Sequence, residues 1–207
     1  MNATPLESAQ AVFEEDQARA DLYALIARLF YAGPDVALLA AIAGADEIAG
    51  EDETAPLAVA WRALGAAAAA MDAEAAREEY DNVFVGTGKA EITPYASHYL
   101  AQSMQERVLV RLRDTLTEMG LAKNSSAAEY EDHFSGLCEV MRQLILFFGS
   151  DDVAVRKQKM FFLGYLVPWY AGFCVEVMAS ANTNFYKYVA GFTKAFLDVE
   201  RDSFELI

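Results

Sequence analysis

The chain has 207 residues, of which 55% are hydrophobic and 12% aromatic, so it can bury a core and intrinsic disorder is excluded. Its formal net charge is −15, and residues 1–80 hold 15 acidic against 4 basic side chains. Nucleic-acid binding depends on neutralising phosphates, so this charge disfavours a nucleic-acid partner and favours a basic one.

The cysteines and the first residues favour a cytoplasmic protein. Cys138 and Cys174 lie in apolar helical patterns, which predicts buried free thiols in a reducing compartment. Residues 1–17 lack the basic and apolar segments of a secretory signal. The uncharged stretch 160–175 is shorter than the roughly 20 residues that a membrane helix needs, so we expect a buried helix and no stable membrane insertion.

Helical periodicity runs through nearly the whole chain and predicts an all-α helical bundle. Gly33-Pro34 ends the first helix, Pro56 opens the third, and Ser150 or Asp151 is expected to cap the long helix that follows. The expected helices cover about 9–31, a short segment from Pro34, 56–71, 73–84, 97–119, 132–148, 151–180 with a kink before Pro168, and 184–199.

The polar segment 121–130 is the best internal linker. We expect one all-helical domain, 1–207, with possible lobes 1–120 and 131–207 on either side of it. Such a linker would permit two chains to exchange lobes, so the expected state is a monomer or a lobe-exchanged homodimer.

Residues 86–89, Gly-Thr-Gly-Lys, raise the question of a phosphate-binding loop. A P-loop has a further glycine separated by four residues from its Gly-Lys pair, Ser or Thr after the lysine, and a buried strand before it. Here Val83 and Ala90 occupy those positions, and no strand pattern precedes them. We therefore expect an exposed turn and no nucleotide cofactor.

Metal chemistry is a second alternative. Glu129, Glu131, Asp132 and His133 form the richest cluster of carboxylates with an imidazole, a set that suits a divalent ion. The ferritin-like Glu-x-x-His spacing is absent, because Tyr130 stands at its first position. The competing interpretation is that Glu131 or Asp132 caps the helix that follows, where a carboxylate favours the helix dipole.

Nucleophilic catalysis finds no support. Ser97 and His98 are adjacent, but neighbours on a helix point about 100° apart. No nucleophile elbow or catalytic-cysteine signature is present, so we expect no catalytic residues. The aromatic residues around 79–100 indicate either a buried helix–loop–helix corner or a groove for an apolar or basic peptide.

Four blocks, in chain order, resemble the TorD family of molybdoenzyme-maturation chaperones, which includes DmsD- and NarJ-type proteins. The blocks are ARADLYALIARLF at 18–30, EYDNVFVGTGKAEITPYASHYL at 79–100, YEDHF at 130–134 and QKMFFLGYLVPWYAGF at 158–173. The chain departs from the family pattern at Tyr130, where proline is usual, and at Tyr165, where histidine is usual.

The resemblance implies an all-α chaperone with two lobes and no enzymatic activity. Such proteins bind the catalytic subunit of a molybdenum-containing oxidoreductase, often through its twin-arginine signal peptide, and hold it in the cytoplasm for cofactor insertion. An acidic protein suits that basic peptide. The residues that match family motifs, and that we expect to contact the peptide or shape its groove, are Phe84, Pro94, Tyr95, Ser97, Tyr99, Asp132 and His133.

Two other functions stay open from the sequence. One is a helical metal-binding or redox enzyme built on Glu129–His133, and the other is a helical adaptor for an unrelated protein. The sequence does not name the client enzyme among formate, nitrate, dimethyl sulfoxide and trimethylamine N-oxide systems.

Overall fold

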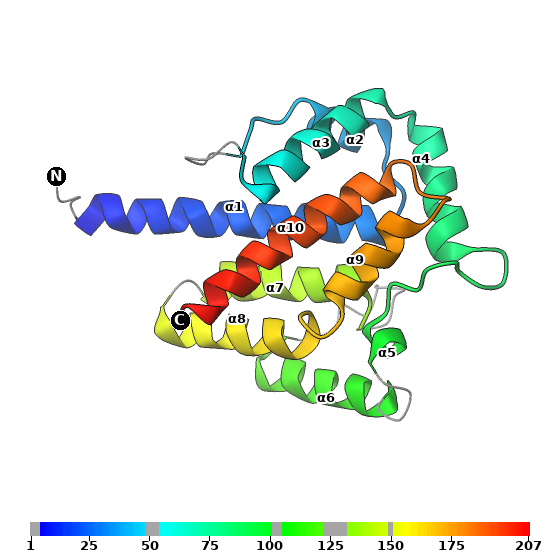
Figure 1. Cartoon of the computed structure of the whole chain (residues 1–207). Coiled ribbons are helices and arrows are strands. Elements are labelled where there is room, and N and C mark those ends of the chain that lie inside the picture. The colour runs from blue at the N-terminus through cyan, green and yellow to red at the C-terminus, as the bar shows by residue number, and fades with distance from the viewer. Residues whose placement is uncertain (1–4, 49–53, 101–104, 122–131, 149–150) are drawn as a thin grey trace.

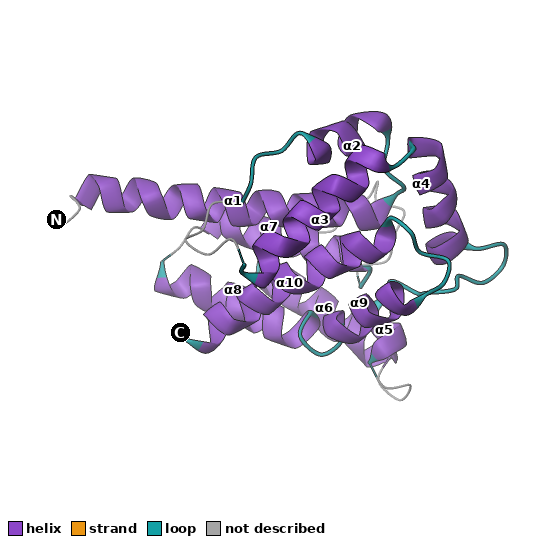
Figure 2. Cartoon of the chain, turned by 45° about the horizontal axis from the view of Figure 1, so that its top comes forward, coloured by secondary structure: helices purple, strands orange, loops and turns teal. Residues whose placement is uncertain are grey.

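The structure, a computed structural model, describes residues 5–48, 54–100, 105–121, 132–148 and 151–207. Ten α-helices and one π-helix make up most of these residues, and no β-strand occurs among them (Figures 1 and 2). The all-α prediction is confirmed. The helices are α1 (Pro5–Tyr31), α2 (Val36–Ala43), α3 (Pro56–Ala70), α4 (Ala73–Tyr80), η1 (Asp81–Val85), α5 (Ala96–Tyr99), α6 (Gln105–Glu118), α7 (Phe134–Phe148), α8 (Asp152–Tyr165), α9 (Tyr170–Ala179) and α10 (Tyr186–Glu205).

Three helix–helix contacts form the centre of the bundle. α1 packs along α7, and α10 packs against both α3 and α9. α8 lies beside α7, and α6 lies at the outer edge beyond α8, while the N-terminal end of α1 projects past the other helices (Figure 1). Figure 2 shows α2 and α3 covering the side of the bundle opposite α6. Helices from both predicted lobes therefore share one hydrophobic core.

Aromatic rings fill the middle of that core. Phe30 of α1 lies 5.1 Å from Phe134 of α7 and 5.2 Å from Phe173 of α9, measured between ring centroids. The rings of Phe134 and Phe173 are 4.9 Å apart. Edge-to-face and tilted pairs at these distances stabilise a core beyond the area they bury. The triangle ties the first helix to the two helices that carry the later family blocks.

A partly buried ion pair joins α1 to α10. The Arg19 guanidinium donates to both carboxylate oxygens of Glu200, at 2.8 and 2.9 Å, and the Tyr23 hydroxyl donates to the same carboxylate at 3.0 Å. Burial alone would lower the pKa of Arg19, but Glu200 outweighs it and raises that pKa. Because both charges are paired and hydrogen-bonded, the cluster holds a specific alignment of the two helices.

Several expected helix ends are confirmed. Asp151 caps α8 by accepting from the N–H groups of Val153 and Ala154, and Pro56 is the first residue of α3. Gly120 follows α6 with φ of +74°, as a C-terminal cap requires. The apolar faces predicted for 56–71 and 132–148 pack on the core.

Two predicted helices are wrong in length. The helix expected over 97–119 is interrupted, because Leu100 has extended backbone angles that end α5. The helix expected to reach residue 180 is broken rather than kinked: α8 ends at Tyr165, and α9 starts at Tyr170 at an angle of 53°. Pro168 lies in this break. Proline has no backbone N–H to continue the helical hydrogen bonds, and its ring clashes with the preceding turn. Pro34 precedes α2 instead of opening it, because Asp35 is the N-cap.

The predicted linker lies almost wholly outside the described residues, which omit 122–131. The lobe boundaries and the exchange of lobes stay predictions. Cys138 and Cys174 are buried free thiols, as expected. Over the described ranges, no single helix is long and apolar enough to cross a membrane. The bent pair α8 and α9 reaches the length and apolar composition of a membrane span only when the two helices are taken together.

Candidate functional site

The central block and the YEDHF block meet in the structure. The amide of Ala96 donates to the carbonyl of Asp132 at 3.0 Å, and the amide of Phe134 donates to the carbonyl of Pro94 at 2.9 Å. These bonds make an isolated antiparallel bridge between Tyr95 and His133, whose rings lie 4.9 Å apart. Two segments far apart in sequence thus form one fixed junction at the start of α5 and α7.

Asp132 and His133 act as caps in this junction. The Asp132 carboxylate, which with Glu131 was one of two candidates to cap the helix that follows, accepts from the Ser97 amide of α5 at 2.9 Å. The Nδ1 atom of His133 accepts from the Ser135 amide at 3.2 Å, so His133 caps α7. Their exposed fractions are 1% and 3%, so both side chains shape the site from beneath its surface.

An aromatic wall stands next to the junction. The Tyr99 ring stacks on Trp169 with centroids 5.1 Å apart and an interplanar angle of 23°. The indole N–H of Trp169 donates to the Tyr165 carbonyl at 2.7 Å, across the break at Pro168. The break between α8 and α9 therefore turns Trp169 toward α5, where its ring stacks on Tyr99.

Phe84 lies deeper, at the turn after α4. It follows α4 in the π-helix η1, and its ring packs 5.7 Å from Phe30 and 5.1 Å from Tyr186. With 6% exposed, Phe84 belongs to the core, and its ring packs on Phe173, which also contacts Tyr99. A π-helix of this kind often marks a functional site, because it re-aims the residues that follow.

Glu79 is a residue that the sequence reasoning missed. Its buried carboxylate accepts from the amides of Asn184, Phe185 and Tyr186, at 2.9, 2.9 and 2.7 Å, and so caps α10. The sequence does contain a sign of this role. Glu79 is a charged residue at helical spacing from Ala76 and Val83, both buried, on a face that is otherwise apolar.

The loop after η1 is a tight turn without room for a side chain at its start. Gly86 has φ of +64°, and a Cβ there would lie 2.2 Å from the Lys89 carbonyl oxygen. The amide of Gly86 is already bonded to the Asp81 carbonyl, and the amide of Ile92 to the Val83 carbonyl. This geometry sends the chain back toward the core and places Glu91 beside the end of α9.

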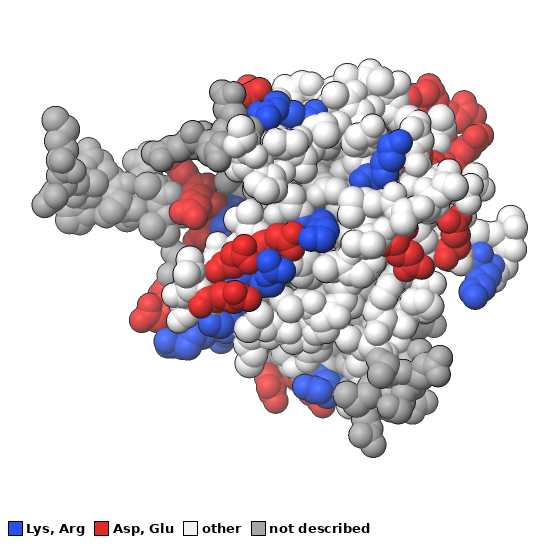
Figure 3. All heavy atoms as spheres, in the orientation of Figure 1, with Lys and Arg blue, Asp and Glu red and all other residues white. Residues whose placement is uncertain are grey.

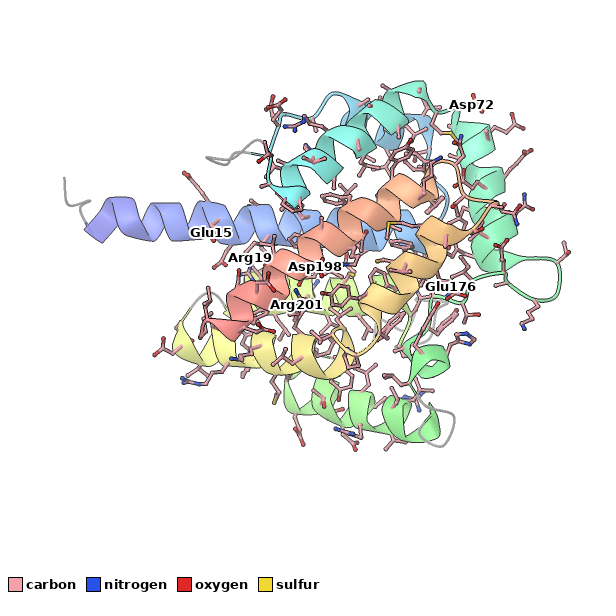
Figure 4. The ribbon with its side chains drawn as sticks, viewed as in Figure 1. Glu15, Arg19, Asp72, Glu176, Asp198 and Arg201 are labelled. Carbon is pink, nitrogen blue, oxygen red and sulfur yellow. The ribbon has the colours of Figure 1, made fainter. Side chains whose placement is uncertain are left out.

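Two carboxylates gather at the C-terminal end of α9. Glu91 accepts from the Ser180 hydroxyl and the Asn182 side-chain amide, both at 2.6 Å, and these hydrogen bonds lower the pKa of Glu91. Exposed Glu176 lies one helical turn before Ser180 and accepts from the Tyr99 hydroxyl at 2.5 Å. Figure 4 shows Glu176 on the side of α9 that faces α5.

This pair suits a cationic ligand. Among the described residues, Glu91 and Glu176 have neutral hydrogen-bond partners and no ion pair with Lys or Arg. The C-terminal end of a helix carries partial negative charge, which adds to the attraction for a cation. By contrast, Asp198 of α10 is already bonded to Lys194, Arg201 and Tyr170 (Figure 4).

An apolar groove begins beside Tyr99. It has a volume of about 410 Å³ and runs between α6 and α8. Tyr165 ties its walls together, because its hydroxyl bonds the Thr115 hydroxyl at 2.7 Å and the Arg111 carbonyl at 3.0 Å. Much of the surface between α10 and α6 carries no charged group (Figure 3). The groove is lined by Leu100, Val108, Arg111, Thr115, Met160, Gly164 and Tyr165.

The seven sequence-predicted site residues thus fall into two sets. Pro94, Asp132 and His133 are buried in the junction, and Phe84 is buried in the core, whereas Tyr95, Ser97 and Tyr99 are half-buried at its surface. Of the suggested metal cluster, Glu129 and Glu131 lie outside the described residues. In the part that is described, no three His, Cys, Asp or Glu side chains are grouped to hold a metal.

Comparison with known proteins agrees with this geometry. A search of curated proteins finds no match. The family model described as "Nitrate reductase delta subunit" matches residues 51–175, more than half of the chain, and the match includes the junction, the aromatic wall and Glu91. The chain therefore belongs to the nitrate reductase delta subunit family, a family of NarJ/TorD-like chaperones for the maturation of molybdoenzymes.

Proposed function

We propose that this protein is a cytoplasmic chaperone that binds the twin-arginine signal peptide of a molybdoenzyme catalytic subunit and holds the subunit for cofactor insertion. The observation that carries the proposal is the pair Glu91 and Glu176, two carboxylates that form no ion pair among the described residues, at the end of α9 beside an apolar groove. A signal peptide offers the complementary chemistry, two guanidinium groups followed by an apolar stretch.

The carboxylates would take the arginines. Ser180, whose hydroxyl donates to Glu91, lies one helical turn after Glu176. Two consecutive arginines leave an extended backbone on opposite faces, but their long, flexible side chains can curl to reach both carboxylates. Arginine binds a carboxylate through two parallel hydrogen bonds, which gives both energy and geometry. The Asp132 carboxylate is buried and bonded to Ser97, so its role here is to hold α5 in place.

The groove would take the apolar stretch of the peptide. Its rim meets the arginine site, since Leu100 follows Tyr99 directly and the Tyr165 carbonyl holds Trp169, on which Tyr99 stacks. Met160, at 57% exposed, and Gly164 line the α8 side and leave apolar surface uncovered among the described residues. Binding is non-covalent and reversible, and no chemical step is assigned to the protein.

Calorimetric titration with the twin-arginine signal peptides of the host's molybdoenzymes tests the proposal. We expect micromolar binding to one of them, weakened by salt and by changing both arginines to glutamine. Glu176→Gln and Glu91→Gln should each weaken binding about tenfold, as loss of a charge-assisted contact predicts. Glu78→Gln, which removes an exposed charge on α4, is the matched control and should bind as the wild type does.

Two results would count against it. If Glu176→Gln and Glu78→Gln weaken binding equally, the attraction is a property of the whole acidic surface and not of this site. If no signal peptide binds while the mature catalytic subunit is captured, the client segment lies elsewhere in that subunit.

A further inference from the structure

The Tyr99 hydroxyl occupies the carboxylate that the proposed function assigns to arginine. Its oxygen lies 2.5 Å from Oε2 of Glu176, a short bond of the charge-assisted kind. Tyr99 belongs to the four-residue helix α5, and its ring is supported from the other side by Trp169 and Phe173. In the described residues, this hydroxyl is the one side-chain partner of Glu176.

We propose that Tyr99 is an internal stand-in for arginine, which closes the Glu176 subsite in the free protein and is displaced by a guanidinium group. The inference rests on the proposed function, in that it takes Glu176 as a ligand for the peptide, and it deepens that function by naming the residue that sets how strongly a ligand must bind to open this subsite. Tyr99 acts as a competitor that any ligand of Glu176 must overcome.

Arginine is better suited than lysine to displace the hydroxyl. The phenol is a neutral donor of one hydrogen bond, whereas a guanidinium is charged and donates two in a planar fork that matches a carboxylate. An ammonium is more strongly hydrated and meets the carboxylate as a point charge. Both cations must break the same hydroxyl contact, so Tyr99 lowers the affinity for each by the same factor. Arginine still binds more tightly, because its guanidinium gains more from the carboxylate.

The stand-in is in place throughout the physiological pH range. Burial of the ring raises the pKa of Tyr99, and the hydrogen bond to Glu176 raises it further. The hydroxyl therefore keeps its proton and donates it in the hydrogen bond to Glu176. After displacement, the ring can keep its stacking on Trp169, because only the hydroxyl contact has to break. The exchange thus requires no unfolding of the junction between residues 94–97 and 132–134.

The first test compares Tyr99→Phe, Glu176→Gln and the double variant by calorimetric titration. The probes are the bound twin-arginine peptide and the same peptide with both arginines changed to lysine. Tyr99→Phe keeps the ring and frees the carboxylate, so we expect about fivefold tighter binding of both peptides, with the arginine peptide still the tighter ligand. The double variant should match Glu176→Gln. Equal or weaker binding by Tyr99→Phe would overturn the proposal and make Tyr99 an orienting residue.

The second test separates this inference from the proposed function. Arginine amide carries the guanidinium without a signal peptide, and its addition is followed by NMR of protein labelled at the Cζ atoms of tyrosine. The Tyr99 signal, assigned by its loss in Tyr99→Phe, should move with arginine amide more than with lysine amide, and should not move in Glu176→Gln. If it moves while no signal peptide binds, the stand-in is supported and the proposed client segment is wrong. If arginine amide leaves it unchanged, the stand-in is wrong.

Discussion

Replacing Glu79 by alanine removes the cap of α10, the helix that packs against α3 and α9. Three backbone N–H groups lose their acceptor, and those of Phe185 and Tyr186 lie in buried hydrogen bonds. A buried donor left unsatisfied costs about 1–3 kcal/mol, so two of them give a loss of about 3 kcal/mol in the free energy of unfolding. Glu79→Gln keeps one acceptor oxygen, and we expect it to lose about half as much.

Urea unfolding followed by far-UV circular dichroism measures this loss. Exposed Glu78 precedes Glu79 on α4, so Glu78→Ala is the matched control and should change stability by less than about 0.5 kcal/mol. The dependence of the free energy on urea should stay constant, because the native core is retained. A loss below about 1 kcal/mol for Glu79→Ala would refute the reasoning, since it would mean that water satisfies the freed amides.

Three further outcomes are expected. Gly164→Leu should raise the free energy of unfolding by about 0.5 kcal/mol, because glycine weakens a helix and a side chain at this position meets open space. The same change should weaken peptide binding, because the leucine fills the groove, and unchanged binding would place the apolar stretch elsewhere. Burial raises the pKa values of Cys138 and Cys174, so a thiol reagent at pH 8 should react with neither until the protein unfolds; rapid reaction of the native protein would contradict their burial. Hydrogen bonds lower the pKa of Glu91 in the folded state, so its contribution to stability is present above the unfolded pKa of about 4.3 and is lost as the pH falls through the folded value. Acid titration of Glu91→Gln should therefore lack that part of the decline seen in the wild type, and identical acid profiles would count against the contact.

The sequence by itself determined the helices and the faces they bury. Helical periodicity predicted a helix over 132–148, and Leu137, Met141 and Leu144, which follow that period, are buried in α7, because the spacing of apolar residues along a helix is a local property. Local chemistry also predicted the Asp151 cap and the turn after η1. It overestimated continuity at Leu100 and Pro168, where tertiary contacts of Tyr99 and Trp169 stabilise a break that helix propensity alone does not show.

Only the tertiary structure decided which polar groups meet. Asp132 caps a helix that begins 36 residues earlier, Glu79 caps one more than 100 residues later, and Glu91 and Glu176 come together at the end of α9. The sequence placed Asp132 among the residues that contact the peptide or shape its groove, which stays a prediction, and it did not single out the exposed carboxylates of Glu91 and Glu176. The physical reason is that a carboxylate carries the same chemistry wherever it occurs. Its burial and its donors depend on segments that are distant in the chain and are brought together only when the core packs.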